Sequence, residues 1–473
     1  MKKLCFAVLA SLILIANLSA VDIFVSTTGS GDFSGNSWSN AINGGNYTVG
    51  LNVQNAIKAA VSDSATEVNV YFASGTYTTT NQISLSSITI PVRLSGGYLG
   101  TADNSFERAD NTVFKRSTYN IRFLALTSLS SFTADGISFQ GGFISGGAAR
   151  GGAIYADKST AVISNCVFTS NAYKTTTNDP RKTGYHGGGG AIAAINSGSL
   201  LIDNCKFDKN YASNNGGYCC SFGAAVMAYK VNITVRNSTF TGNYMNGSSG
   251  RQTYFGAAIG TEHGNVEIYN CTFAGNYIQG SWYSPGGASG GALSIRNPGT
   301  FKMSDSVFTG SYVASGSSTT FPYAAGIILL DDWRTSDGLA TSVIERCVFD
   351  SRTVPGTISS RPAQSDFLLS GGSLFMTNCL FFAARGNGTY GNYSVRNHGG
   401  IAYSGATSKY YGYDGYSSVT CASSEMELVN CTIADGKGYG VASLGGSLSK
   451  MMNSISCGHT VSGAHNVASI EYS

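Results

Sequence analysis

The chain has 473 residues, of which 61 are glycine and only 12% are charged, and its formal net charge is +3. So small a charge argues against a nucleic-acid partner, because proteins that bind nucleic acid carry dense basic surfaces. The 27 tyrosines and 24 phenylalanines argue against disorder, since aromatic side chains supply the apolar burial that folding needs.

The first twenty residues have the layout of a cleavable secretory signal. A positive start at Met1-Lys2-Lys3 precedes a nearly unbroken apolar run, residues 4–15, and small residues end it at Ala20. We predict residues 1–20 as a signal peptide and expect the mature chain to be secreted, either extracellular or on the cell outer membrane surface. No later stretch of the sequence approaches membrane-span length, so we expect no integral membrane segment in the mature chain.

Residues 21–134 are predicted to form an N-terminal cap and the first coils of a stacked structure. Residues 53–60 have the pattern of a short amphipathic helix, and residues 68–72 and 94–98 that of strands. A cap is needed because the open end of a coil exposes apolar side chains and unpaired strand edges.

Residues 135–473 carry two alternating motifs. The first is Asn-Cys-x-Phe-x-x-Asn, with a copy that begins at each of Asn165, Asn204, Asn237 and Asn270 and degenerate copies after them. The second is Gly-Gly-Ala-Ile or a close variant, and it lies upstream of most copies. The spacing from its Ile to the Phe of the first motif is nearly constant, as from Ile154 to Phe168, and the length variation falls after the second Asn.

A fixed segment followed by one variable loop is typical of stacked coils. Each period has room for three short strands, and neighbouring coils bury their apolar faces against each other. The predicted fold class is therefore all-β: a single-stranded right-handed parallel β-helix, a solenoid, with an N-terminal cap that contains one short helix.

Stacking in register predicts columns of identical side chains along the helix. The Phe and Cys side chains would form inward columns, because alternate residues of a strand share a face. The second Asn of each motif would form an amide ladder at a turn, since Asn tolerates left-handed backbone and hydrogen-bonds locally. The predicted ladder residues are Phe168, Phe207, Phe240, Phe273, Asn171, Asn210, Asn243, Asn276, Cys166, Cys205 and Cys271.

The paired motifs resemble the repeats of the chlamydial polymorphic membrane proteins, within the pectin-lyase-like β-helix superfamily. The resemblance covers the repeats from about residue 135 onward. It implies a passenger on the bacterial surface, where a membrane barrel would follow. The chain ends in an apparent strand at Ser473, so we expect a fragment or a short secreted relative.

Cys347, Cys379 and Cys431 also occupy the repeat position, and the four remaining mature cysteines do not. The vicinal Cys219 and Cys220, together with Cys421 and Cys457, are available for pairing in an oxidising compartment. Their partners cannot be derived from the sequence. The repeat thiols lack the geometry of a bridge or of a metal site, and we expect no metal and no cofactor.

A catalytic interpretation has one set of candidates. Glu262, His263, Arg296 and Asp331 follow the second motif at similar spacing, so they would lie on neighbouring coils at one turn. A polysaccharide lyase or glycoside hydrolase needs carboxylates and a cation close together. A solvated row of weakly paired charges explains the same residues, and we predict no catalytic site here.

Binding has a stronger candidate. Tyr211, Tyr244, Tyr277 and Tyr312 each follow the second Asn position directly, which predicts an aromatic row beside the loops. Tyrosine offers broad contact area with a polar end, which suits glycans or protein surfaces. The same rings could instead cover the apolar flank of the helix. The leading functional hypothesis is a non-enzymatic, adhesin-like scaffold, and the rival is an extracellular polysaccharide-degrading enzyme.

Overall fold

The computed structural model describes most of residues 19–471. The parts it leaves out within that span are residues 46, 102–105, 119, 148, 176–185, 215–217, 248–250, 281–287, 297, 316–323, 331–340, 351–360, 363–364, 371–372, 383–397, 405–424, 435–438, 445–447, 458–461 and 466–468.

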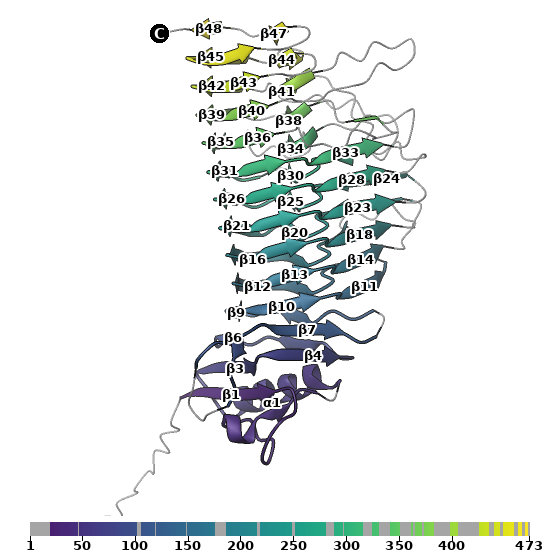
Figure 1. The fold of residues 1–473 in the computed structure, drawn as a ribbon, viewed down its shortest axis with the longest axis vertical. Coiled ribbons are helices and arrows are strands. Elements are labelled where there is room, and N and C mark those ends of the chain that lie inside the picture. The colour runs from purple at the N-terminus through teal and green to yellow at the C-terminus, as the bar shows by residue number, and fades with distance from the viewer. Residues whose placement is uncertain are drawn as a thin grey trace, which may run out of the picture.

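The chain winds into a right-handed parallel β-helix, which confirms the predicted fold class (Figure 1). Most coils contribute one strand to each of three long parallel sheets, so the strands of one sheet come from successive coils. Together these three sheets are called the coil below. The long strands β12 and β16 pass from the first sheet into the second and join the two.

In the middle coils, the strands of the first sheet begin at the apolar residue that ends the second motif, and two strands of this sheet precede the repeats. The strands of this sheet are β5 (Ile83–Ser86), β8 (Leu124–Thr127), β12 (Ile154–Ser164), β16 (Ile192–Asp203), β20 (Val226–Tyr229), β25 (Ile259–Glu262), β30 (Leu293–Arg296), β34 (Ala324–Leu330), β38 (Ser365–Ser370), β41 (His398–Ser404), β44 (Tyr439–Leu444) and β47 (Ser462–His465).

The second sheet holds strands from before the repeats and, within the repeats, the strands that precede the first residue of each Asn-Cys-x-Phe-x-x-Asn motif. They are β1 (Ala20–Ser26), β2 (Ile42–Asn43), β3 (Glu67–Ala73), β6 (Val92–Tyr98), β9 (Phe132–Asp135), the ends of β12 and β16, β21 (Asn232–Arg236), β26 (Val266–Tyr269), β31 (Phe301–Ser304), β35 (Thr341–Glu345), β39 (Ser373–Thr377), β42 (Glu425–Val429), β45 (Leu448–Met452) and β48 (Ser469–Glu471).

The third sheet holds short strands, and those from Phe168 to Phe381 carry the motif phenylalanines. The strands of this sheet are β4 (Gly75–Thr79), β7 (Thr112–Arg116), β10 (Ile137–Gln140), β13 (Val167–Thr169), β17 (Lys206–Asp208), β22 (Thr239–Thr241), β27 (Thr272–Ala274), β32 (Val307–Thr309), β36 (Val348–Asp350), β40 (Leu380–Phe382), β43 (Thr432–Ala434) and β46 (Ile455–Cys457).

Two shorter sheets extend the middle coils sideways, and together they are called the wing below (Figure 1). In the coils that have a strand in both of these sheets, the chain leaves along the fourth sheet and returns along the fifth. The fourth holds β11 (Phe143–Gly146), β14 (Ala172–Thr175), β18 (Tyr211–Asn214), β23 (Tyr244–Gly247), β28 (Tyr277–Gly280), β33 (Tyr312–Ser315) and β37 (Arg361–Pro362). The fifth holds β15 (His186–Gly188), β19 (Tyr218–Phe222), β24 (Arg251–Phe255) and β29 (Ala288–Ser289).

The inside of the coil is one continuous apolar core whose centre is a column of aromatic rings. The motif phenylalanines of neighbouring coils are paired in register, as Phe168 with Phe207 and Phe207 with Phe240. Their ring centroids lie 4.8 and 4.6 Å apart with nearly parallel planes. Similar stacking continues through Phe273 and reaches Phe381. Parallel sheets impose this stacking because they repeat every side chain at the spacing of the strands.

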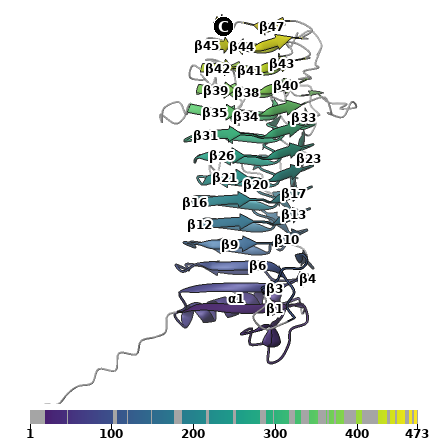
Figure 2. The ribbon, with the colours of Figure 1, turned by 60° about the vertical axis from the view of Figure 1, so that its left-hand side comes forward.

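The N-terminal end is covered by a helix. Helix α1 (Val49–Ser62) contains the predicted segment 53–60, extends beyond it at both ends, and buries Val49, Val53 and Ile57 completely against the first coils. A short 3-10 helix, η1 (Trp38–Asn40), precedes it. Figure 2 shows α1 closing the lower end of the solenoid. The boundaries of the three predicted segments, 1–20, 21–134 and 135–473, remain predictions.

Among the described residues, no helix has the length and apolar character needed to cross a membrane.

Candidate functional site

The second Asn of each motif lies inside the coil and is saturated with hydrogen bonds. Asn210, which is fully buried, donates from Nδ2 to the Phe168 carbonyl at 3.0 Å and to Asn243 Oδ1 at 2.9 Å. Its own Oδ1 accepts the backbone N–H and the side chain of Asn171, both at 3.0 Å. Asn243 repeats the pattern with Asn276. With all four bonds made inside the protein, this amide ladder supports the fold and offers nothing to a ligand.

The turn at this ladder differs from the one expected. The left-handed backbone belongs to the residue before the Asn, as at Lys209 (φ 51°) and Gly242 (φ 59°), and not to the ladder Asn itself. A second left-handed position falls on the first Asn of each motif, with φ of 53° at Asn165 and 50° at Asn204. The first Asn of the motif therefore allows the left-handed turn, and the second Asn forms the buried hydrogen bonds.

The repeat cysteines are buried and free. Cys166, Cys205 and Cys271 point into the core, and serine takes the same place in other coils, as at Ser238. Burial raises the pKa of the Cys271 thiol to about 11, so the thiol form persists at neutral pH. Cys457 is exposed and free. Cys421 and the side chains of Cys219 and Cys220 lie outside the described residues.

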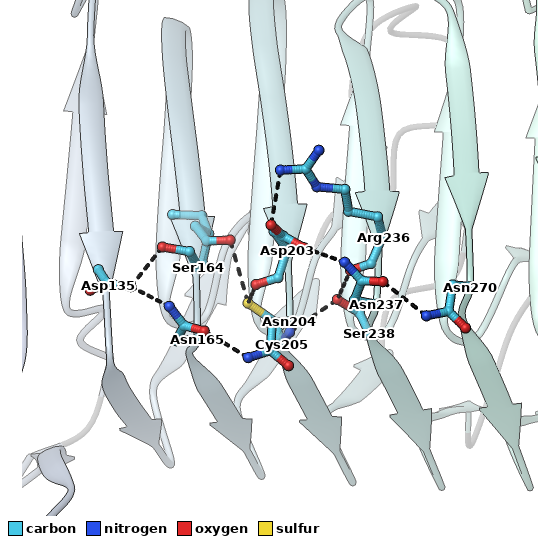
Figure 3. A network of polar contacts seen from close by, with 11 residues as sticks. Asp135, Ser164, Asn165, Asp203, Asn204, Cys205, Arg236, Asn237, Ser238 and Asn270 are labelled. Atoms are coloured by element: carbon cyan, nitrogen blue, oxygen red, sulfur yellow. Dashed lines mark hydrogen bonds and ion pairs between the residues drawn. The ribbon is translucent and has the colours of Figure 1, made fainter.

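An exposed polar strip runs along the corner between the second and third sheets (Figure 3). Asn165 donates to Asp135 at 2.6 Å, and Asn204 donates to Asn165 at 2.7 Å. One coil further on, Asp203 accepts from Asn237 and pairs with Arg236, both at 2.9 Å. These bonds hold the pKa of Asp203 below its ordinary value despite some burial. The strip binds adjacent coils to one another along their outside.

The predicted tyrosine row forms on the outer face of the fourth sheet. Tyr211, Tyr244, Tyr277 and Tyr312 are paired in register on successive strands. Their ring centroids lie 5.3, 5.2 and 5.0 Å apart, with interplanar angles of 9°, 6° and 3°. Asn246 and Gln279 point to the same side, because they lie two residues beyond their tyrosines, and both are exposed. Met245 and Ile278 between them face inward and are fully buried.

This stacking determines what the row can offer to a ligand. Rings about 5 Å apart leave no room for a sugar ring or another aromatic group between them, so the inner ring faces are closed. The hydroxyls remain available, because none of the four has a hydrogen-bond partner among the described residues. Partial burial raises the pKa of Tyr244, Tyr277 and Tyr312, so these three phenols are neutral at physiological pH. It presents a straight line of neutral hydroxyls flanked by amides.

Two members of the catalytic candidate set lie in contact. Glu262 and Arg296 occupy paired positions on β25 and β30, and Arg296 Nη1 lies 3.5 Å from Glu262 Oε1. The exposed fractions of the two side chains are only 12% and 18%. The Arg296 guanidinium also covers the Phe255 ring at 4.8 Å from its centroid and the Phe222 ring at 5.6 Å. An arginine held this way stabilises the wing against the coil.

The other two candidates are placed differently. His263 follows Glu262 at a left-handed turn position (φ 59°). Its ring and that of Tyr229 pack edge to face, with 6.1 Å between the two centroids. Asp331 lies outside the described residues. Within the described part of the chain, no group of three or more His, Cys, Asp or Glu side chains is arranged to hold a metal ion.

Sequence reasoning missed the apolar layers under the wing. Phe222 and Phe255 stack at 4.7 Å on the fifth sheet and bury Ile195 and Met227, which point outward from the first sheet. A second layer lies under the fourth sheet and includes Tyr173, Met245 and Ile278. A signal was present in the sequence, since a Phe precedes the glycine of the second motif in two successive coils, at Phe222-Gly223 and Phe255-Gly256.

The fold defines the chain as a right-handed parallel β-helix protein. Its sequence matches no family that was compared and no curated protein.

Similar solved structures include the A-module of the mannuronan C-5 epimerase AlgE6 from Azotobacter vinelandii. It is 11% identical, with 90% of this chain and 94% of that chain covered and a TM-score of 0.36. The catalytic domain of a GH87 α-1,3-glucanase is 10% identical, with 89% and 66% covered and a TM-score of 0.32. PfbA, a surface adhesin of Streptococcus pneumoniae, is 13% identical, with 89% of each chain covered and a TM-score of 0.29. At these values the likeness is not informative about the activity of this chain.

Proposed function

We propose that this protein is a non-enzymatic, exported β-helix scaffold that acts as an adhesin-like passenger and binds glycans or protein surfaces through its tyrosine row. The observation that carries the proposal is the line of four stacked tyrosines whose hydroxyls have no partner in the described residues, beside the exposed amides of Asn246 and Gln279. Export rests on the signal-like residues 1–20 and surface attachment on the repeat resemblance.

A glycan fits the row better than a protein surface does. The row offers neutral hydrogen-bonding groups at a regular spacing, and a linear glycan presents hydroxyls along its whole length. The closed ring faces exclude the stacking of a sugar on each ring. Recognition would therefore depend on hydroxyls and amides more than on apolar contact.

Binding to a glycan array and to whole cells tests this proposal. Tyr244→Phe keeps the ring stack but removes one hydroxyl at the centre of the row, and Tyr244→Phe/Tyr277→Phe removes two. We expect the double variant to bind about tenfold or more weakly, because each lost hydrogen bond costs about 1 kcal/mol. Tyr269→Phe, on the outside of the second sheet, is the matched control and should bind as the wild type does. Uniformly blank arrays and cells would refute the proposal, as would equal binding by all variants.

The contact of Glu262 with Arg296 favours a second candidate, an extracellular polysaccharide lyase or hydrolase of the pectin-lyase-like class. A carboxylate and a cation side by side are the groups that such chemistry uses. Purified protein would be assayed on polyuronides beside Arg296→Ala. Activity that disappears in the variant would replace the non-enzymatic proposal with this one, whereas the ion pair and ring contacts of Arg296 lead us to expect none.

A further inference from the structure

Arg122 is a mostly buried cation without a counter-charge. Its guanidinium lies over the ring of Tyr155, with 4.9 Å between its central carbon and the ring centroid. Its Nε is buried and has no hydrogen-bond partner, and no described residue forms an ion pair with it. Burial lowers its pKa, and only the phenol of Tyr155 acts against that effect. A buried donor of a charged group that makes no hydrogen bond is costly, so an acceptor placed at the Arg122 Nε would be stabilising.

A second arginine faces the same phenol. Arg150 hydrogen-bonds to the Tyr155 side chain, and the charges of Arg150 and Arg122 both lower the pKa of that phenol, which burial and Asp157 raise. Arg150 is bridged to Gly188, which is itself paired in register with Phe222. Arg150 therefore occupies the same register position, on an earlier coil, as Phe222 and Phe255 do on the fifth sheet.

One carboxylate is nearby, but it has other partners. Asp157 accepts from the Asn196 amide at 3.0 Å and lies 3.5 Å from the Tyr155 hydroxyl. Its charge acts on Tyr155 but is not among the causes that shift the pKa of Arg122. Two guanidinium groups thus act on one phenol, and Asp157 does not act on Arg122.

We propose that Arg122 and Arg150 form a binding site for an oxyanion, a carboxylate or sulfate ester carried by an acidic glycan, at the N-terminal edge of the fifth sheet. Guanidinium groups bind such planar or tetrahedral oxyanions through paired N–H donors, and the charge-assisted bonds are strong. Tyr155 supplies the floor of the site. The choice of a glycan as carrier rests on the proposed function, whereas the oxyanion rests on the two arginines alone.

Direct titration of the full chain tests the site. Polygalacturonate, neutral dextran and sodium sulfate would be titrated into the wild type, Arg122→Gln, Arg150→Gln and the control Arg236→Gln. Arg236 undergoes the same change of charge on the exposed corner strip. We expect affinity for polygalacturonate to fall about tenfold or more in the first two variants, to be unchanged in the control, and to be negligible for dextran.

Each result has a defined consequence. Equal losses in all three variants would show diffuse charge attraction and overturn the site, as would a wild type that binds neither polygalacturonate nor sulfate. Sulfate binding that depends on Arg122 without polygalacturonate binding would overturn the glycan carrier. Loss of array binding in the tyrosine variants is independent of these outcomes, so the site and the proposed function can fail separately.

A stability measurement distinguishes a binding role for Arg122 from a purely structural one. In the absence of ligand, Arg122→Met should raise the unfolding temperature, because it removes an unpaired desolvated charge and keeps apolar contact with Tyr155. A lower unfolding temperature would mean that the arginine is there to hold the fold, and it would overturn the proposal. Should Arg122→Gln not fold, Arg122→Lys, which keeps the charge but loses the paired donors, takes its place in the titration.

Discussion

The coil and the wing both contain columns of side chains stacked in register, but they differ in whether the polar groups of these columns are hydrogen-bonded. In the coil, the phenylalanine column stacks in register and is fully buried, and beside it the amides of Asn171, Asn210 and Asn243 satisfy one another. On the wing, Tyr244 and its neighbours stack just as regularly, yet their hydroxyls have no partner among the described residues. The comparison indicates that stacked groups that satisfy one another stabilise the fold, whereas stacked groups with unsatisfied hydroxyls remain available for binding.

The largest difference between the two regions is expected for ring deletion. Phe240→Ala removes a buried ring between two stacked neighbours and leaves a cavity, which should lower the free energy of unfolding by about 4 kcal/mol. Tyr244→Ala removes a ring from the outer row and should cost about 1 kcal/mol, because that ring is only partly buried. Urea unfolding followed by circular dichroism measures both. Equal losses would mean that the wing is as much a part of the core as the coil.

Amide deletion should show the next largest difference. Asn210→Ala leaves several buried donors and acceptors of Asn171, Asn243 and Phe168 without a partner, and should cost about 3 kcal/mol. Asn204→Ala on the exposed corner strip is the control. It should cost about 1 kcal/mol, through the left-handed backbone that alanine adopts poorly. Similar values for the two variants in urea unfolding would contradict the division of roles between the two motif asparagines.

The smallest effect concerns the pH dependence of the corner strip. Hydrogen bonds from Arg346 lower the pKa of Asp305 to about 2, below its ordinary value near 3.9. A lowered pKa in the folded state means that Asp305 stabilises the protein above about pH 4 and that this contribution is lost as the pH falls towards 2. Both side chains are half exposed, so the effect should stay below about 1 kcal/mol.

Asp305→Asn removes the charge and keeps a residue type that tolerates the left-handed turn. Its unfolding temperature should lie slightly below that of the wild type at pH 6, and the two should converge near pH 2. A difference that persists at pH 2 would contradict an origin in the Asp305 charge.

The sequence predicted the coil well because its repeats carry the register. The spacing from Ile154 to Phe168 recurs in later coils. This constant spacing largely determines which residues of neighbouring coils stack on each other. The tyrosine row could be predicted in the same way, since each member follows a motif position. The wing was not predicted, because its strands lie in the variable segment, where lengths differ from coil to coil. Phe222 and Phe255 lie in this variable segment and pack on residues of the first sheet, so a motif alignment does not reveal their contact.

The sequence by itself determined the β-helix, the inward columns of Phe and Cys, and the placement of Glu262 and Arg296 on neighbouring coils. These features follow from the alternation of inward and outward side chains along each strand and from the length of the repeat, and both can be seen in the sequence. Only the tertiary structure decided which faces are covered. The fifth sheet lies over the outer side of the first, so that Arg296 of the first sheet covers the rings of Phe222 and Phe255 on the fifth. Such contacts join segments of unrelated sequence, and burial, which depends on the whole fold, gives them their energy.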